Sequence, residues 1–196
     1  KLNWGEILAS TQKSNVDGSF HEVATGKVSA RSEAAGEFRV ASDKESQASA
    51  IDVFRGSLQI SSGGRVEHLD SGERIRADAS GQFQAKEVLP SVPRLIAPAD
   101  QKIFVHENPS QASTTLAWEK TPGAARYHLV ISDRLLFTVA LYDADRAETT
   151  VQLDGLLPGE YYWKVASVLP AGVRGPYSEP WRFRVTSQSL HDKEDT

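Results

Sequence analysis

The chain has 196 residues, of which 39% are hydrophobic and 24% charged, and its formal net charge is −4. This composition is typical of a globular protein and excludes a chain that is disordered throughout. The 22 basic residues are interspersed among 26 acidic ones without a long basic run. Nucleic acid is therefore excluded as a partner, and no apolar stretch approaches the roughly 18 residues that membrane insertion requires.

Cysteine is absent, which excludes disulfides, a thiolate nucleophile and cysteine-bound metal or iron–sulfur sites. Methionine is also absent and the sequence begins at Lys1, without the charged and apolar layout of a signal peptide. We therefore expect a processed or truncated piece of a longer protein.

Two halves of different composition meet near Pro90. All nine prolines lie at or after this residue, whereas nine of the fourteen glycines precede it. Proline restricts its own backbone and that of its predecessor, so a Pro-containing linker at 90–93 is expected to be short and semi-rigid. The predicted domains are residues 1–89 and 94–187, followed by a solvated tail at 188–196.

Short apolar alternation interrupted by glycine characterises residues 1–89. Segments such as 37–40 and 58–60 have the period of two that predicts strands with one covered face. From Gly56 onward a glycine returns every eight or nine residues, a spacing that suits a meander or a solenoid-like stack of short strands. Residues 44–49 are predicted to form an exposed hairpin tip.

Three stretches of this half share a pattern of alternating apolar residues and glycine. They are ARSEAAGEFRV at 30–40, AIDVFRGSLQI at 50–60 and VEHLDSGERI at 66–75. Together they resemble the FecR-type domain of bacterial envelope signalling proteins. The resemblance implies a FecR-like β domain and a periplasmic location. It also implies a role in relaying the state of an outer-membrane receptor to a cytoplasmic sigma factor. We expect Gly36, Gly56 and Gly72 to be turn or bulge positions.

The second half contains longer strand-like segments separated by proline-containing turns. Seven strands in about 95 residues predict an immunoglobulin-like sandwich. The predicted strands are 93–98, 114–119, 126–132, 135–142, 149–153, 161–168 and 181–186.

Four motifs characterise this half. They are LAW at 116–118, ARYHLVI at 125–131, LPGEYYWKV at 157–165 and GVRGPYS at 172–178 leading into WRFRV. Their pattern resembles a fibronectin type III domain. Alternation places Tyr161 and Trp163 on one strand face, so we expect Trp118 to oppose them in the core. The resemblance gives Tyr161 a tyrosine-corner role, with its hydroxyl bonded to nearby backbone.

No motif points to catalysis, a cofactor or a metal. A nucleophile elbow and a phosphate-binding glycine pattern are missing from the sequence. The five histidines never occur at the spacings that direct two imidazoles to one metal. His68 and His128 are expected to face solvent. We therefore predict no catalytic, cofactor-binding or metal-binding residues and a non-enzymatic protein.

The favoured hypothesis is a non-catalytic extracytoplasmic module that recognises another protein of the bacterial envelope, as a signal relay or a scaffold. Because loops vary without disturbing a core, three loops, 44–47, 62–65 and 173–177, are the expected interaction surfaces. The candidate residues are Lys44, Glu45, Gly63, Arg65, Arg174, Tyr177 and Trp181.

Two other hypotheses remain open from the sequence. The first is a glycan- or peptidoglycan-binding accessory module, in which an exposed Tyr177 and Trp181 would stack on a sugar of the cell wall. The second is an enzyme with a cleft at the seam of the two halves, near Arg94, Asp100 or Glu119. If the chain instead binds by strand addition, exposed sheet edges are the expected surfaces.

Overall fold

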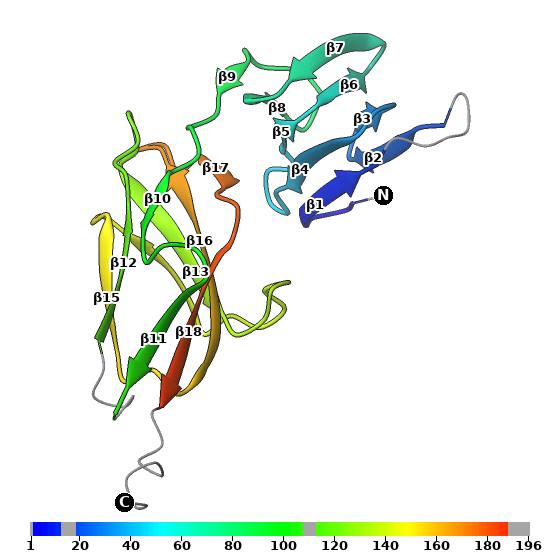
Figure 1. Ribbon diagram of the computed structural model, residues 1–196. Coiled ribbons are helices and arrows are strands. Elements are labelled where there is room, and N and C mark those ends of the chain that lie inside the picture. Colours follow the sequence, from blue (N-terminus) through cyan, green and yellow to red (C-terminus); the bar gives the residue numbers. More distant parts are fainter. Residues whose placement is uncertain (1, 13–18, 108–112, 188–196) are drawn as a thin grey trace, which may run out of the picture. The chain divides into compact units, whose positions relative to one another are not determined.

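The computed structural model describes residues 2–12, 19–107 and 113–187 and contains two compact units, residues 1–89 and 90–196 (Figure 1). The predicted all-β fold class is confirmed, since the described residues form strands, turns and loops. In the part of the chain that the structure describes, no helix has the length and apolar character needed to cross a membrane. The predicted tail at 188–196 lies outside the described residues.

The first unit consists of two sheets that enclose a mainly aliphatic core. The strand order is β1-β4-β5-β8-β9 in one sheet and β2-β3-β6-β7 in the other. The strands are β1 (Gly5–Thr11), β2 (His21–Thr25), β3 (Val28–Ser32), β4 (Gly36–Ser42), β5 (Ser49–Arg55), β6 (Ser57–Ser62), β7 (Arg65–Asp70), β8 (Glu73–Ala77) and β9 (Glu87–Val88).

Successive hairpins of this unit alternate between its two sheets. The pairs β2-β3 and β6-β7 belong to one sheet, and β4-β5 and β8-β9 belong to the other. The sequence left a meander and a solenoid-like stack open. The alternation places each hairpin beside the one two positions earlier in the chain, which is a stack rather than a single meander.

The core of the first unit follows the predicted alternation. Its fully buried members include Phe38, Val40, Ile51 and Ile60, which project from neighbouring strands into one cluster. Burying each such side chain contributes about 1.5–3 kcal/mol.

Gly36 and Gly56 allow two chain segments of the first unit to touch. A Cβ at Gly36 would lie 2.8 Å from the carbonyl oxygen of Arg55, and one at Gly56 would lie 2.7 Å from that of Ala35. Gly56 also has a φ of 82°, which side chains rarely adopt. The two predicted glycine positions therefore allow the start of β4 to contact the β5-β6 junction.

The second unit is a sandwich of two sheets, drawn as two layers in Figure 1. One sheet has the order β10-β12-β15, and the other has the order β11-β18-β16-β13-β14, with β17 paired to β16. The strands are β10 (Leu95–Ala97), β11 (Lys102–His106), β12 (Ser113–Trp118), β13 (Arg126–Ser132), β14 (Tyr142–Arg146), β15 (Thr150–Asp154), β16 (Gly159–Val168), β17 (Arg174–Tyr177) and β18 (Trp181–Ser187).

Aromatic side chains fill the space between these sheets. Trp118 and Trp163 are 2% and 0% exposed, and their ring centroids lie 6.4 Å apart, as the predicted facing arrangement requires. Tyr161 stacks on Phe183, and its hydroxyl donates a 2.8 Å hydrogen bond to the carbonyl oxygen of Leu157. The expected backbone bond of Tyr161 is confirmed.

The predicted strand at 135–142 is wrong. Strand β13 ends at Ser132 and β14 begins only at Tyr142, which pairs with Ile131, so residues 133–141 form the connecting loop. The apolar run at 135–141 lacks the alternation that a strand with one buried face requires. Three strands were also overlooked, β11, β14 and β17. Strand β11 pairs in parallel with the distant β18, and such a long-range partner leaves no local signal.

The segment 90–93 carries no strand and packs within the second unit. Pro90 and Pro93 are buried, and the hydroxyl of Ser167 donates a 2.9 Å hydrogen bond to the carbonyl oxygen of Ser91. A Cβ at Gly175 would lie 2.5 Å from the carbonyl oxygen of Pro90. The two prolines thus contribute to the body of the second unit.

Candidate functional site

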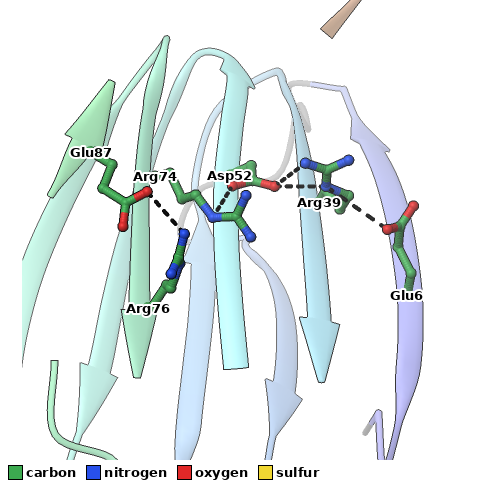
Figure 2. A network of polar contacts seen from close by, with 6 residues as sticks. All are labelled: Glu6, Arg39, Asp52, Arg74, Arg76 and Glu87. Atoms are coloured by element: carbon green, nitrogen blue, oxygen red, sulfur yellow. Dashed lines mark hydrogen bonds and ion pairs between the residues drawn. The ribbon is translucent and has the colours of Figure 1, made fainter. Parts of the chain in front are cut away.

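Charged side chains line the face of the β1-β4-β5-β8-β9 sheet opposite the core (Figure 2). Arg39 of β4 is the direct cross-strand partner of Asp52 of β5. Asp52 is in turn opposite Arg74 of β8, which is opposite Glu87 of β9. Charges of alternating sign therefore follow one another across four strands, in positions that alternate with core residues.

Asp52 is the centre of this charge row. Its Oδ2 accepts a 2.6 Å hydrogen bond from Nε of Arg39 and lies 2.5 Å from Nη2 of the same residue. Its Oδ1 lies 3.3 Å from Nε of Arg74. At the ends of the network, Glu6 lies 4.0 Å from Arg39, and Arg76 donates a 3.2 Å hydrogen bond to Glu87 (Figure 2).

Burial dominates the electrostatics of the charge row. Asp52 is 0% exposed, and burial raises its pKa above the ordinary value although Arg39 and Arg74 pull it down. Burial also lowers the pKa of Arg74. Both carboxylate oxygens of Asp52 face guanidinium groups, an arrangement that pairs strands. We assign the charge row a structural role.

The predicted loop at Lys44 and Glu45 is the exposed tip of the β4-β5 hairpin. Asp43 shapes this turn, because its Oδ1 accepts hydrogen bonds from the backbone amides of Glu45 and Ser46, at 3.1 and 2.7 Å. Lys44 projects toward Trp4, with its Nζ 5.6 Å from the ring centroid. The tryptophan was not among the candidate residues, because only the pairing of Gly5 with Ser42 brings it beside this loop.

The predicted loop at Gly63 and Arg65 is the two-residue turn between β6 and β7. Ser62 pairs with Arg65, and the glycines between them have φ values of 55° and 84°. This left-handed pair is what a tight hairpin turn requires. The requirements of the turn therefore account for Gly63, and Arg65 is exposed at the start of β7.

Arg174 and Tyr177 contact each other, whereas Trp181 packs on a core residue. Trp181 packs edge-on against the core residue Trp163 at a centroid distance of 6.3 Å. Tyr177 instead contacts two cations, with Nζ of Lys164 at 4.5 Å and the guanidinium carbon of Arg174 at 5.4 Å from its ring centroid. Each of the two rings therefore has its own intramolecular partner, which does not favour a joint stacking platform of Tyr177 and Trp181.

His128 is half-buried rather than fully facing solvent. Its Nε2 lies 2.8 Å from Asp143 and its Nδ1 lies 2.7 Å from Asp145. Burial alone would raise the pKa of Asp145, but hydrogen bonds from His128 and Arg126 hold it below the ordinary value. His68 is exposed, as expected. Among the described residues, no group of three His, Cys, Asp or Glu side chains is arranged to hold a metal ion.

The residues considered for a seam cleft make contacts within the second unit. Arg94 forms an ion pair with Glu119. Asp100 accepts a 2.9 Å hydrogen bond from the backbone amide of Arg182. These contacts account for all three side chains.

The loop at 133–141 exposes several apolar side chains that were not among the candidate residues. Leu135, Leu136, Val139 and Leu141 are 58%, 82%, 53% and 55% exposed. The signal is present in the run LLFTVAL at 135–141, which is apolar except for Thr138 and for that reason favoured a strand. Each strand of a sandwich has one buried face, so its apolar and polar residues alternate. An apolar run without this alternation therefore favours a loop.

Hydrogen bonds give the apolar loop a defined shape. The hydroxyl of Ser132 donates to the carbonyl oxygen of Val139 at 2.6 Å and accepts from the amide of Arg134 at 3.0 Å. The amide of Phe137 bonds to the carbonyl oxygen of Arg134 at 3.0 Å, and that of Leu141 bonds to Ile131 at 2.8 Å. Phe137 has a φ of 52°, a strained value that these contacts maintain.

Comparison with known proteins returned no matching family model and no matching curated protein. Among solved structures, a protein assigned as an anti-sigma factor from Parabacteroides distasonis is 21% identical, with a TM-score of 0.38. The match covers 43% of this chain and 38% of that one, and a second structure described in the same way, 17% identical at a TM-score of 0.38, covers 54% and 58%. The chain thus spans less than two thirds of either.

Fibronectin-like structures are also similar to this chain. A Fn3-like protein from Clostridium thermocellum is 18% identical over 50% of this chain and 96% of its own length, with a TM-score of 0.38. At these identities and TM-scores the similarities establish neither a family nor a function.

Proposed function

We propose that this chain is a non-catalytic, extracytoplasmic protein-recognition module of a bacterial envelope protein. In this proposal the loop 133–141 binds another envelope protein. The observation that carries it is a loop with four backbone or side-chain hydrogen bonds that nevertheless leaves Leu136 82% exposed. Solvent-exposed apolar groups held in a defined shape are typical of a binding surface.

The charges around the apolar loop favour a protein over a lipid surface. The segment 133–146 carries three acidic residues, Asp133, Asp143 and Asp145, and two basic ones, Arg134 and Arg146, so it has no basic excess. Binding to an anionic membrane surface requires a basic excess. A partner protein with an apolar depression would bury several leucine-sized side chains, each worth about 1.5–3 kcal/mol.

The envelope location and the signalling or scaffolding role in this proposal rest on the FecR-like stretches of the first unit. The second unit supplies the recognition loop. A cell-wall glycan at Tyr177 and Trp181 is not favoured, because Trp181 packs against Trp163.

Site-specific photo-crosslinking tests the proposal. A photoreactive phenylalanine analogue replaces Leu136 in the full protein, which is then irradiated in the envelope of its source cells. The matched control is Leu157, which is 68% exposed on the same unit outside the loop. We expect a protein adduct from position 136 that is absent from position 157 and is lost when Leu135→Asp is added.

Two results would overturn the proposal. One is a set of adducts that is the same at positions 136 and 157. The other is an adduct formed with lipid alone. Either would mean that the loop has no specific protein partner.

A further inference from the structure

A hollow at one end of the first unit combines an exposed tryptophan with polar groups. Its lining includes Asn3, Trp4, Ser42, Asp43, Lys44 and Gln47. Trp4 is 62% exposed, whereas Trp118 and Trp163 are almost fully buried. An indole left in solvent beside a hollow is a feature that core packing does not explain.

The position of Trp4 is determined by backbone contacts on both sides of it. The amide of Leu2 donates a 2.7 Å hydrogen bond to the carbonyl oxygen of Ala24. Gly5 is paired with Ser42 at the end of β4. Because the chain is held before and after the tryptophan, its ring remains next to the β4-β5 turn.

The opposite wall of the hollow is a preformed turn. Oδ1 of Asp43 accepts bonds from two backbone amides and from the hydroxyl of Ser46, the last at 2.7 Å. The amide of Asp43 bonds to the carbonyl oxygen of Ala48 at 2.9 Å, and Gln47 has a φ of 54°. Among the described residues these bonds use only Oδ1, so Oδ2 remains available as an acceptor. Hydrogen bonds from Ser46 lower the pKa of Asp43, so it stays ionised.

We propose that this hollow binds the pyranose ring of a neutral glycan, with Trp4 stacking on the C–H face of the sugar and Asp43 accepting its hydroxyl hydrogens. The assignment does not depend on the proposed role of loop 133–141. Flat aromatic faces and a few fixed polar groups are what a small polar ring requires. A carboxylate makes strong, short hydrogen bonds with hydroxyl donors.

The charges of the hollow distinguish a neutral sugar from charged ligands. Asp43 would repel an anionic ligand, and Lys44, with its ammonium 5.6 Å from the Trp4 ring centroid, would repel a cationic one. Both groups can hydrogen-bond to hydroxyls, Lys44 as donor and Asp43 as acceptor.

Titration of the full protein with two oligosaccharides, followed by NMR of the tryptophan indole N–H signals, tests the site. The probes are a β-1,4-linked tetramer of N-acetylglucosamine and the corresponding glucose tetramer, at up to about 10 mM because single-ring contacts bind near the millimolar range. We expect a saturable shift of the Trp4 signal with at least one probe. A shift with the acetylated tetramer alone points to wall-type glycans, and a shift with both points to a general pyranose site.

Three variants make the assignment specific. Trp4→Ala lacks the reporting indole, so its binding is followed by the backbone amide signals of the β4-β5 turn, and it is expected to be at least tenfold weaker. Asp43→Asn keeps an acceptor for the turn but replaces Oδ2 with a donor, and is expected to weaken binding several-fold. The matched control is Phe20→Ala, which removes an exposed aromatic ring with Arg31 3.9 Å above it, outside the hollow, and should leave binding unchanged. Absence of a Trp4 shift with both probes, or unchanged binding by Trp4→Ala, would overturn the proposal.

Discussion

The two units have similar strand content but stabilise their sheets differently. The first unit has a mainly aliphatic core and a charge row on its outer sheet face, centred on Asp52. The second unit places two tryptophans, two tyrosines and Phe183 between its sheets. In both units the alternation along each strand determines which side chains are buried. The kind of side chain that fills the core differs between the units.

The largest effect is expected in the aromatic core. Trp163→Ala removes a side chain that is 0% exposed and contacts Trp118 and Trp181. Large-to-small changes of this kind cost about 3–5 kcal/mol. Urea denaturation of the full chain should show this loss, whereas Trp4→Ala should change the unfolding free energy little. A comparable loss from both variants would contradict the distinction between core and exposed tryptophans.

The next largest effect is expected at the charge row. Asp52→Ala leaves the guanidinium groups of Arg39 and Arg74 without their shared carboxylate, and breaking such a pair costs about 3 kcal/mol. Denaturation of this variant should be compared with that of Asp70→Ala, whose carboxylate is exposed.

A triple variant tests whether the charges of Arg39, Asp52 and Arg74 stabilise the sheet beyond neutralising one another. Replacing Arg39 and Arg74 with Met and Asp52 with Leu should restore most of the lost stability, because apolar groups avoid the cost of burying charge. If the triple variant is as unstable as Asp52→Ala, the ion pairs of the charge row themselves add to the free energy of unfolding.

A smaller effect is expected at Tyr161. Tyr161→Phe keeps the ring on Phe183 but removes the 2.8 Å hydrogen bond to Leu157, which should cost about 1 kcal/mol. The unfolding midpoint in urea measures this loss. The control is Tyr162→Phe, whose hydroxyl contacts the side chain of Glu160 at 3.1 Å on the outer face and should matter less.

The smallest effect is a pH dependence of opposite sign in the two units. The pKa of Asp52 is raised in the folded state, so its contribution is present below about 3.8 and is lost as the pH rises through the raised value. The pKa of Asp145 is lowered, so its contribution is present above about 3.8 and is lost as the pH falls through the lowered value.

Difference curves measure these two contributions. The unfolding free energy of the unaltered chain minus that of Asp52→Asn should fall as the pH rises from about 3.5 to 7. The corresponding difference for Asp145→Asn should rise over the acid end of that range. Equal signs would contradict the assignment of burial to one site and hydrogen bonding to the other.

Local alternation of apolar and polar residues in the sequence was enough to predict which strand faces are buried. The covered faces at Phe38, Ile51 and Trp163 and the hydroxyl contact of Tyr161 followed from period two and a family resemblance. The charge row could not be predicted, since Arg39, Asp52 and Arg74 become neighbours only through strand register. Trp4 reaches the β4-β5 turn for the same reason, through the pairing of β1 with β4.

The alternation of hairpins between the two sheets of the first unit has a consequence for its evolution. Each new hairpin extends the open end of its own sheet, as β8-β9 extends β4-β5 and β6-β7 extends β2-β3. Contacts are therefore mostly between near neighbours in the stack, as in repeat proteins. A duplicated pair of hairpins would lengthen such a unit without changing the contacts of the existing hairpins. Gene duplication could therefore change the length of the unit by one hairpin pair at a time.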